Sequence, residues 1–229
     1  MSALYKKEIY MVLSYFFIGG LVKPCFTQFS YYFMLNEAHI TKFQFAMFGV
    51  LSRACNIVGT VIYKNHFRQT ETRTVIFYST IISVISAFGH LVFALRWNLQ
   101  MGIPDLIFII FTDVVLGCFL LAFCVLPCMA LFAKITPPGI EGTIFAFLTG
   151  IWHFSDCVVS PLIGNLINQK LAHVTASDLS NYPQLMLIAF LSSFFGFFTL
   201  WLIPLEGDIG RYRRERGERV VVVVDEKGR

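Results

Sequence analysis

The most decisive stretch of the sequence, residues 106–135, reads LIFIIFTDVVLGCFLLAFCVLPCMALFAKI and holds only two charged residues, Asp113 and Lys134. A helix needs about 20 mostly apolar residues to cross the hydrocarbon core of a bilayer. This run exceeds that length, so it predicts a transmembrane helix.

Five further apolar runs of similar length lie before and after it, at residues 9–35, 43–63, 74–95, 140–168 and 184–205. Short polar loops separate them, so sequential neighbours are antiparallel. We therefore predict an all-α polytopic membrane protein with six transmembrane helices. Residues 1–205 form the six-helix bundle, and residues 206–229 form a basic, flexible C-terminal tail.

The composition excludes an ordinary soluble domain. Hydrophobic residues make up 56% of the chain and charged residues 14%, whereas a soluble domain carries roughly 25% charged residues. The bilayer is thus the expected surrounding of the chain. The six cysteines all fall inside predicted spans, where they act as small apolar residues. We expect no metal site, no cofactor and no nucleic-acid partner.

Lysine and arginine residues in the flanks predict the orientation. If both termini lie on one side, that side receives the tail and six other basic residues: Lys6, Lys7, Lys64, Arg68, Arg73 and Lys134. The opposite side receives Lys42, Arg96 and Lys170. Both termini are therefore expected on the cytoplasmic or equivalent side. The plasma membrane and an organelle inner membrane both remain open.

Six polar or ionisable residues inside the predicted spans are the candidate site residues, because a charge at the bilayer centre costs at least about 2.5–3.5 kcal/mol. They are Lys23, Arg53, Asn56, Asp113, His153 and Asp156. One interpretation is a polar cavity for a charged solute; the other is a set of structural ion pairs that fix helix packing. In the first, Lys23 and Arg53 suit an anionic solute, and Asp113 or Asp156 takes up and releases a proton.

Helix-weakening residues occur in three of the spans. Pro24 lies beside Lys23, Pro127 lies in the fourth span, and Pro161 lies in the fifth. Interrupted spans around a central site are typical of transporters. We expect a break in the first span at Lys23 and Pro24.

Two stretches resemble the folate–biopterin transporter family. One is Gly102-Ile103-Pro104-Asp105, followed by the apolar run with Asp113. The other reads PCMALFAK at 127–134 and PPGIEGTIFAFL at 137–148. The resemblance covers most of residues 8–205, in order and with similar spacing.

This resemblance implies the fold of the major facilitator superfamily, whose members usually have twelve spans in two six-helix halves. The chain is similar to the C-terminal half, in which spans four to six repeat the topology of the first three, inverted. The matching motif residues are Asp105, Asp113, Pro127, Gly139 and Glu141. Glu141 is expected to open the fifth helix, where a carboxylate favours the positive end of the helix dipole.

The resemblance implies a transporter of folates, pteridines or similar organic anions, coupled to protons. Its partner would be a second half-bundle, a homodimer mate or a larger membrane assembly. The alternative is a transport-inactive structural or accessory subunit, and a third reading is a fragment of a full-length transporter. An enzyme is not expected, because the chain has no nucleophile elbow, no P-loop and no metal motif.

Overall fold

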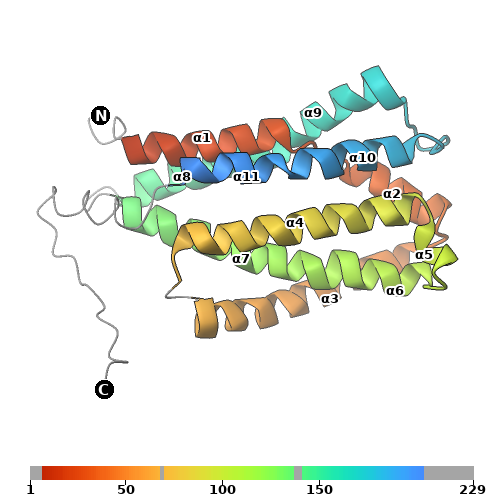
Figure 1. The fold of residues 1–229 in the computed structure, drawn as a ribbon, viewed down its shortest axis with the longest axis horizontal. Coiled ribbons are helices and arrows are strands. Elements are labelled where there is room, and N and C mark those ends of the chain that lie inside the picture. Colours follow the sequence, from red (N-terminus) through yellow and green to blue (C-terminus); the bar gives the residue numbers. More distant parts are fainter. Residues whose placement is uncertain (1–6, 68–69, 137–140, 204–229) are drawn as a thin grey trace, which may run out of the picture.

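The computed structural model describes residues 7–67, 70–136 and 141–203, which form a bundle of six helical spans (Figure 1). Spans 1 to 6 comprise Tyr10–Asn36, Lys42–Phe67, Thr72–Ala94, Asp105–Ala133, Gly142–Ala172 and Tyr182–Leu202. Each agrees with its predicted run to within a few residues, so the six-span all-α fold is confirmed. Gly139 and the tail from residue 206 lie outside the described residues.

Several spans are built from more than one helical segment. Spans 1 to 3 contain α1 (Lys7–Val22), α2 (Thr27–Asn36), α3 (Lys42–Ile62), the π-helical η2 (Tyr63–Phe67) and α4 (Thr72–Ala94), followed by the short α5 (Trp97–Gln100). Span 4 contains α6 (Asp105–Ile109), the π-helical η3 (Ile110–Leu116) and α7 (Gly117–Ile135). Spans 5 and 6 contain α8 (Glu141–Phe154), the π-helical η4 (Ser155–Val159), α9 (Ser160–Ile167), the π-helical η5 (Asn168–Ala172), α10 (Tyr182–Ser193), α11 (Phe195–Thr199) and the 3₁₀ segment η6 (Leu200–Leu202).

One of the two prolines Pro24 and Pro127 interrupts its span, and the other does not. Span 1 breaks between Val22 and Thr27, because Pro24 has no backbone N–H and disfavours helical geometry in the residue before it. In span 4, by contrast, α7 runs continuously through Pro127, which is buried. The interruption expected at Pro24 is present, and the helix does not end at Pro127.

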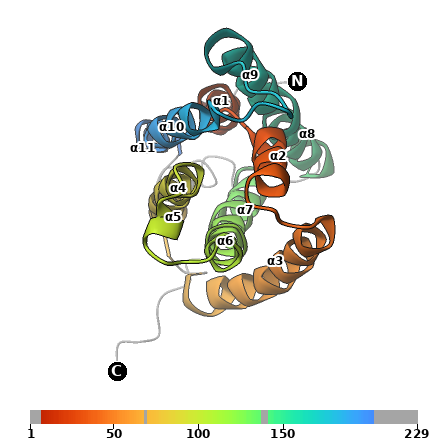
Figure 2. The ribbon, with the colours of Figure 1, turned by 90° about the vertical axis from the view of Figure 1, so that its right-hand side faces the viewer.

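The packing of the spans follows an approximate internal symmetry. Span 1 packs on spans 5 and 6, span 4 packs on spans 2 and 3, and spans 3 and 6 pack on each other. Exchanging the first three spans with the last three reproduces these pairs. Spans 1 and 4 run in opposite directions, so the arrangement is that of two inverted three-helix repeats. In Figure 2, α3 lies at the bottom of the bundle and α8 and α9 lie at the upper right, while α4 and α10 lie at the left.

The two larger of three apolar cores occupy the two ends of the bundle, and a smaller one lies around Phe123. We call the end where α1 begins and η6 ends the proximal end, and the opposite end the distal end (Figure 1). Val12, Phe132 and Leu148 belong to the proximal core, and Phe33 and Tyr182 belong to the distal core. Polar side chains and cavities lie between these cores, in the part of the bundle where span 1 is broken.

Candidate functional site

The unwound segment of span 1 is held by the start of α9. The hydroxyl of Ser160 donates a hydrogen bond to the carbonyl of Lys23. The backbone N–H of Cys25 donates to the carbonyl of Ser160 over 3.1 Å. A Cβ on Gly164 would lie 2.2 Å from the Cys25 carbonyl oxygen, so only glycine admits this approach. Non-helical backbone persists at membrane depth where such protein partners satisfy it.

A first cavity of about 190 Å³ lies beside this break. Spans 1, 4, 5 and 6 line it, and both Lys23 and Asp156 contribute to its wall. The Lys23 Nζ lies 3.6 Å from the position that a Cβ on Gly196 would occupy, so the ammonium is against span 6. Among the described residues, neither ion pair joins Lys23 to Asp156. The two opposite charges that the sequence indicated thus share one cavity without being paired.

A π-helical segment places Asp156 in this cavity. Asp156 lies in η4. The hydroxyl of Ser155, the first residue of η4, donates a hydrogen bond to the Phe16 carbonyl over 2.8 Å. A Cβ on Gly20 would lie 1.9 Å from the Ser155 hydroxyl oxygen, so spans 1 and 5 make close contact there. π-helical turns inside α-helices occur frequently at functional sites.

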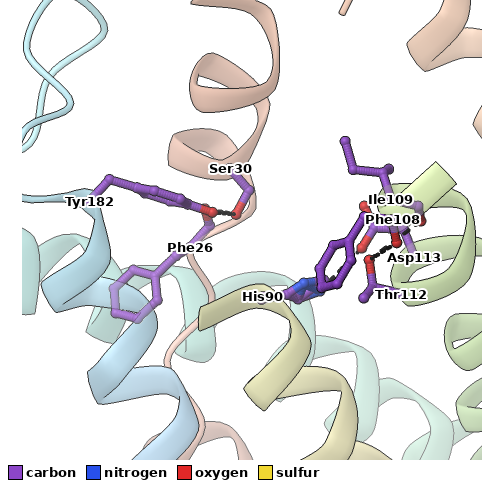
Figure 3. A network of polar contacts seen from close by, with 8 residues as sticks. All are labelled: Phe26, Ser30, His90, Phe108, Ile109, Thr112, Asp113 and Tyr182. Atoms are coloured by element: carbon purple, nitrogen blue, oxygen red, sulfur yellow. Dashed lines mark hydrogen bonds and ion pairs between the residues drawn. The ribbon is translucent and has the colours of Figure 1, made fainter. Parts of the chain in front are cut away.

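A second cavity, of about 240 Å³, lies nearer the distal end and contains an acid–histidine pair. His90 Nε2 on α4 lies 3.2 Å from Asp113 Oδ1 on η3 (Figure 3). Tyr31 and Tyr182 also line this cavity, and the Tyr182 hydroxyl donates to the Ser30 hydroxyl over 3.0 Å. Both ionisable members of the pair line this cavity.

His90 is not among the site residues predicted from the sequence, although its partner Asp113 is. The available signal was an ionisable residue inside the apolar run FGHLVF at 88–93. Such residues inside membrane spans commonly pair with one another. His90 therefore met the same criterion as the other candidates.

A third cavity, of about 330 Å³, adjoins the other two. It shares Lys23 and Ser160 with the first cavity and Ser30 and His90 with the second. Ser83 and Ser86 of α4 also line this middle cavity. The three cavities thus form a row between the two larger apolar cores, with Asp156 and Lys23 at one end and His90 and Asp113 at the other.

Three of the other predicted site residues lie away from this row. Arg53 is exposed on α3 and lines none of the three cavities, and within the described part of the chain it forms no ion pair. Asn56 lies one turn along α3, and its carbonyl accepts a hydrogen bond from the Thr60 hydroxyl over 2.8 Å. His153 is exposed and stacks on Trp152 with ring centroids 5.3 Å apart.

The motif residue Asp105 joins the loops of the distal end. It begins α6 and accepts hydrogen bonds from Arg96 Nη1 over 2.9 Å and from Asn98 Nδ2 over 2.7 Å. Arg96 also donates to the carbonyl of Glu37. Gly102 completes the turn with a φ of 75°, a conformation that glycine adopts without strain. The motif therefore ties the loop between spans 3 and 4 to the loop that follows span 1.

The remaining points concern the motif residue Glu141 and metal-binding side chains. Glu141 is the first residue of α8. Within residues 7–67, 70–136 and 141–203, no group of three or more His, Cys, Asp or Glu side chains could hold a metal ion.

Comparison with known proteins identifies the family. The BT1 family profile matches residues 2–217. The chain is 25% identical over 174 residues to "Folate transporter 1" of Plasmodium falciparum, covering 76% of this chain and 34% of that protein. It is 27% identical over 175 residues to the "Folate-biopterin transporter" of Synechocystis sp., covering 76% and 35%. It is 32% identical over 133 residues to "Probable folate-biopterin transporter 6" of Arabidopsis thaliana, covering 58% and 26%.

No solved structure matches the chain. The chain spans about a third of the length of the curated relatives it matches. The match over residues 2–217 nevertheless covers all six spans. The chain therefore belongs to the BT1 family of folate–biopterin transporters, as the motifs around its fourth and fifth spans predicted.

Proposed function

We propose that this chain forms one six-helix unit of a membrane transporter that moves folate, a pteridine or a similar organic anion. The names of its relatives support the solute class. The observation that carries the proposal is the presence of Lys23 in a cavity at the broken part of span 1. Broken spans frame the solute sites of many transporters.

The chemistry of the first cavity suits such a solute. A folate carries carboxylates and a flat heteroaromatic ring. The Lys23 ammonium would hold a carboxylate through charge-assisted hydrogen bonds. Tyr15, Phe16 and Trp152 line the same cavity and offer aromatic surface for the ring. Asp156 would partly offset the positive charge of Lys23 when no solute is bound.

We further propose that a second six-helix unit completes the transporter. Arg53 is exposed on α3, and a charged side chain facing lipid at that depth costs at least about 2.5–3.5 kcal/mol. Only 6% of the residues in the most apolar 18-residue stretch of span 2 are buried. A partner bundle, whether from the same polypeptide, a second copy or another protein, would cover α3 and give Arg53 a polar environment.

Uptake of radiolabelled folate into proteoliposomes tests the function. The full chain is compared with Lys23→Gln and with a matched control, Lys64→Gln, which removes an exposed lysine from η2 at the proximal end. We expect saturable uptake that Lys23→Gln abolishes and Lys64→Gln preserves. If the wild-type protein co-purifies with a larger assembly and shows no uptake, the result would instead favour a structural or accessory subunit.

A further inference from the structure

Spans 3 and 4 carry an ionisable pair separate from the Lys23 cavity. The His90–Asp113 contact of 3.2 Å joins α4 to η3, and the two side chains are 37% and 31% exposed, respectively. Both side chains line the second cavity, and His90 also lines the middle cavity. Figure 3 shows the pair beside Phe108, Ile109 and Thr112. The pair is thus partly accessible from a cavity inside the bundle.

We propose that His90 and Asp113 form a proton-binding site that is distinct from the solute cavity and linked to it through the row of cavities. This inference rests on the proposed transport function and adds the site of proton coupling. Binding of one proton raises the charge of the pair by one unit, whichever of the two residues takes it. The proton is therefore assigned to the pair rather than to one residue.

The surroundings contain few competing charges. From α2 the second cavity receives Tyr31, from α10 it receives Tyr182, and from α3 it receives the uncharged Phe45. The charged side chain that shares the adjoining middle cavity with His90 is Lys23. A proton on the pair therefore adds positive charge to the same row in which Lys23 would hold the anion.

The physical consequence is coupling between proton and solute. An anion near Lys23 favours the additional positive charge on the pair, and a proton on the pair favours the anion. By linkage, each must raise the affinity for the other by the same factor. A coupling site of this kind lets a proton gradient drive the accumulation of an anion.

The pair lies where a change in its charge reaches the backbone. A Cβ on Gly89 would lie 2.7 Å from Thr112 Cγ2, so α4 and η3 are in close contact at the residues that precede His90 and Asp113. Asp113 lies in the π-helical part of span 4. Loss of the His90–Asp113 ion pair would loosen this contact between spans 3 and 4.

One test measures transport by the full chain in proteoliposomes in two modes. We expect Asp113→Asn and His90→Gln to abolish accumulation driven by an inward proton gradient but to retain counterflow exchange of labelled for unlabelled folate. The matched controls Asp178→Asn and His66→Gln alter exposed residues outside the cavities and should retain both modes. Gradient-driven accumulation by Asp113→Asn at the wild-type level would overturn the proposal.

A second test does not depend on transport. Infrared difference spectra of the protein in lipid vesicles, taken between alkaline and acidic buffer, report the protonation of carboxylates. We expect a carboxylic-acid band that Asp113→Asn removes and Asp178→Asn leaves. If the wild-type chain shows neither uptake nor counterflow, the proposed function fails, while the band still decides the proton site. Difference spectra of Asp113→Asn and His90→Gln that both match the wild type exclude it.

Discussion

Individual ionisable residues inside apolar spans are the part of the candidate site that the sequence predicts. Lys23 and Asp156, identified by their type and depth, line the same cavity. The partner of Asp113 could not be predicted as readily, because His90 comes from a different span and only the packing of α4 on η3 brings the two together. Arg53 has the same sequence signature as Lys23 and is likewise exposed, yet it lines none of the three cavities. The sequence does not tell which face of a helix will border a cavity.

Glycine at position 164 permits the contact that holds the broken segment. A Cβ there would lie 2.2 Å from the Cys25 carbonyl oxygen, so Gly164→Ala must displace the unwound part of span 1. We expect a loss of about 1–3 kcal/mol of stability, as for other substitutions that overfill a packed site. Thermal unfolding of the purified protein in detergent measures it.

Gly150 in α8 provides the matched control for this substitution. No atom lies within 4 Å of a Cβ built on Gly150, so Gly150→Ala should leave the unfolding temperature unchanged or slightly raise it. Equal unfolding temperatures for both alanine variants would contradict the assigned contact between α9 and the break.

Helical elements were predicted in number and extent but not in their irregularities. The break at Pro24 follows from local chemistry, since proline removes a donor and restricts its predecessor. The π-helical segments that carry Asp113 and Asp156 depend on contacts with other spans, such as the bond from Ser155 to the Phe16 carbonyl. No local pattern in the sequence indicates them.

The loops of the distal end are joined through Asp105, and its substitution tests this connection. Asp105→Asn weakens the hydrogen bonds from Arg96 and Asn98. We expect a loss of about 1–2 kcal/mol, because hydrogen bonds to charged groups are among the stronger ones and this carboxylate is mostly shielded from solvent. The measurement is again thermal unfolding in detergent.

Glu37→Gln is the control at the same end of the bundle. Arg96 contacts only the backbone carbonyl of Glu37, and the residue is exposed. The unfolding temperature should therefore stay near that of the wild type. A loss as large as that of Asp105→Asn would mean that general charge at this end, rather than the hydrogen bonds of Asp105, provides the stability.

At the scale of the whole molecule, the count of six spans and their antiparallel order could be predicted because length and loop size determine both. The division into two larger apolar cores with a polar row between them could not, because it requires knowing which spans pack together. The resemblance to a half of a larger bundle supplied the inverted-repeat arrangement, which the pairing of the spans reproduces.

The open face of α3 leads to a prediction about assembly. We expect native mass spectrometry of the protein released from lipid nanodiscs to show at least two six-helix units together. Arg53→Leu should raise the proportion of single units, because the charge of Arg53 would find its partner across that contact, and Arg53→Lys should largely retain the assembly. A wild-type protein that is a single unit and still transports folate would contradict this prediction.

The central claim is that the cavity beside the broken span binds an organic anion through Lys23. The most direct measurement is equilibrium binding of labelled folate to the purified wild-type chain, Lys23→Gln and Lys64→Gln. We predict saturable binding that Lys23→Gln weakens by roughly tenfold or more, as expected for the loss of a charged hydrogen bond, and that Lys64→Gln leaves unchanged. No saturable binding, or equal binding by the wild type and Lys23→Gln, would contradict the claim.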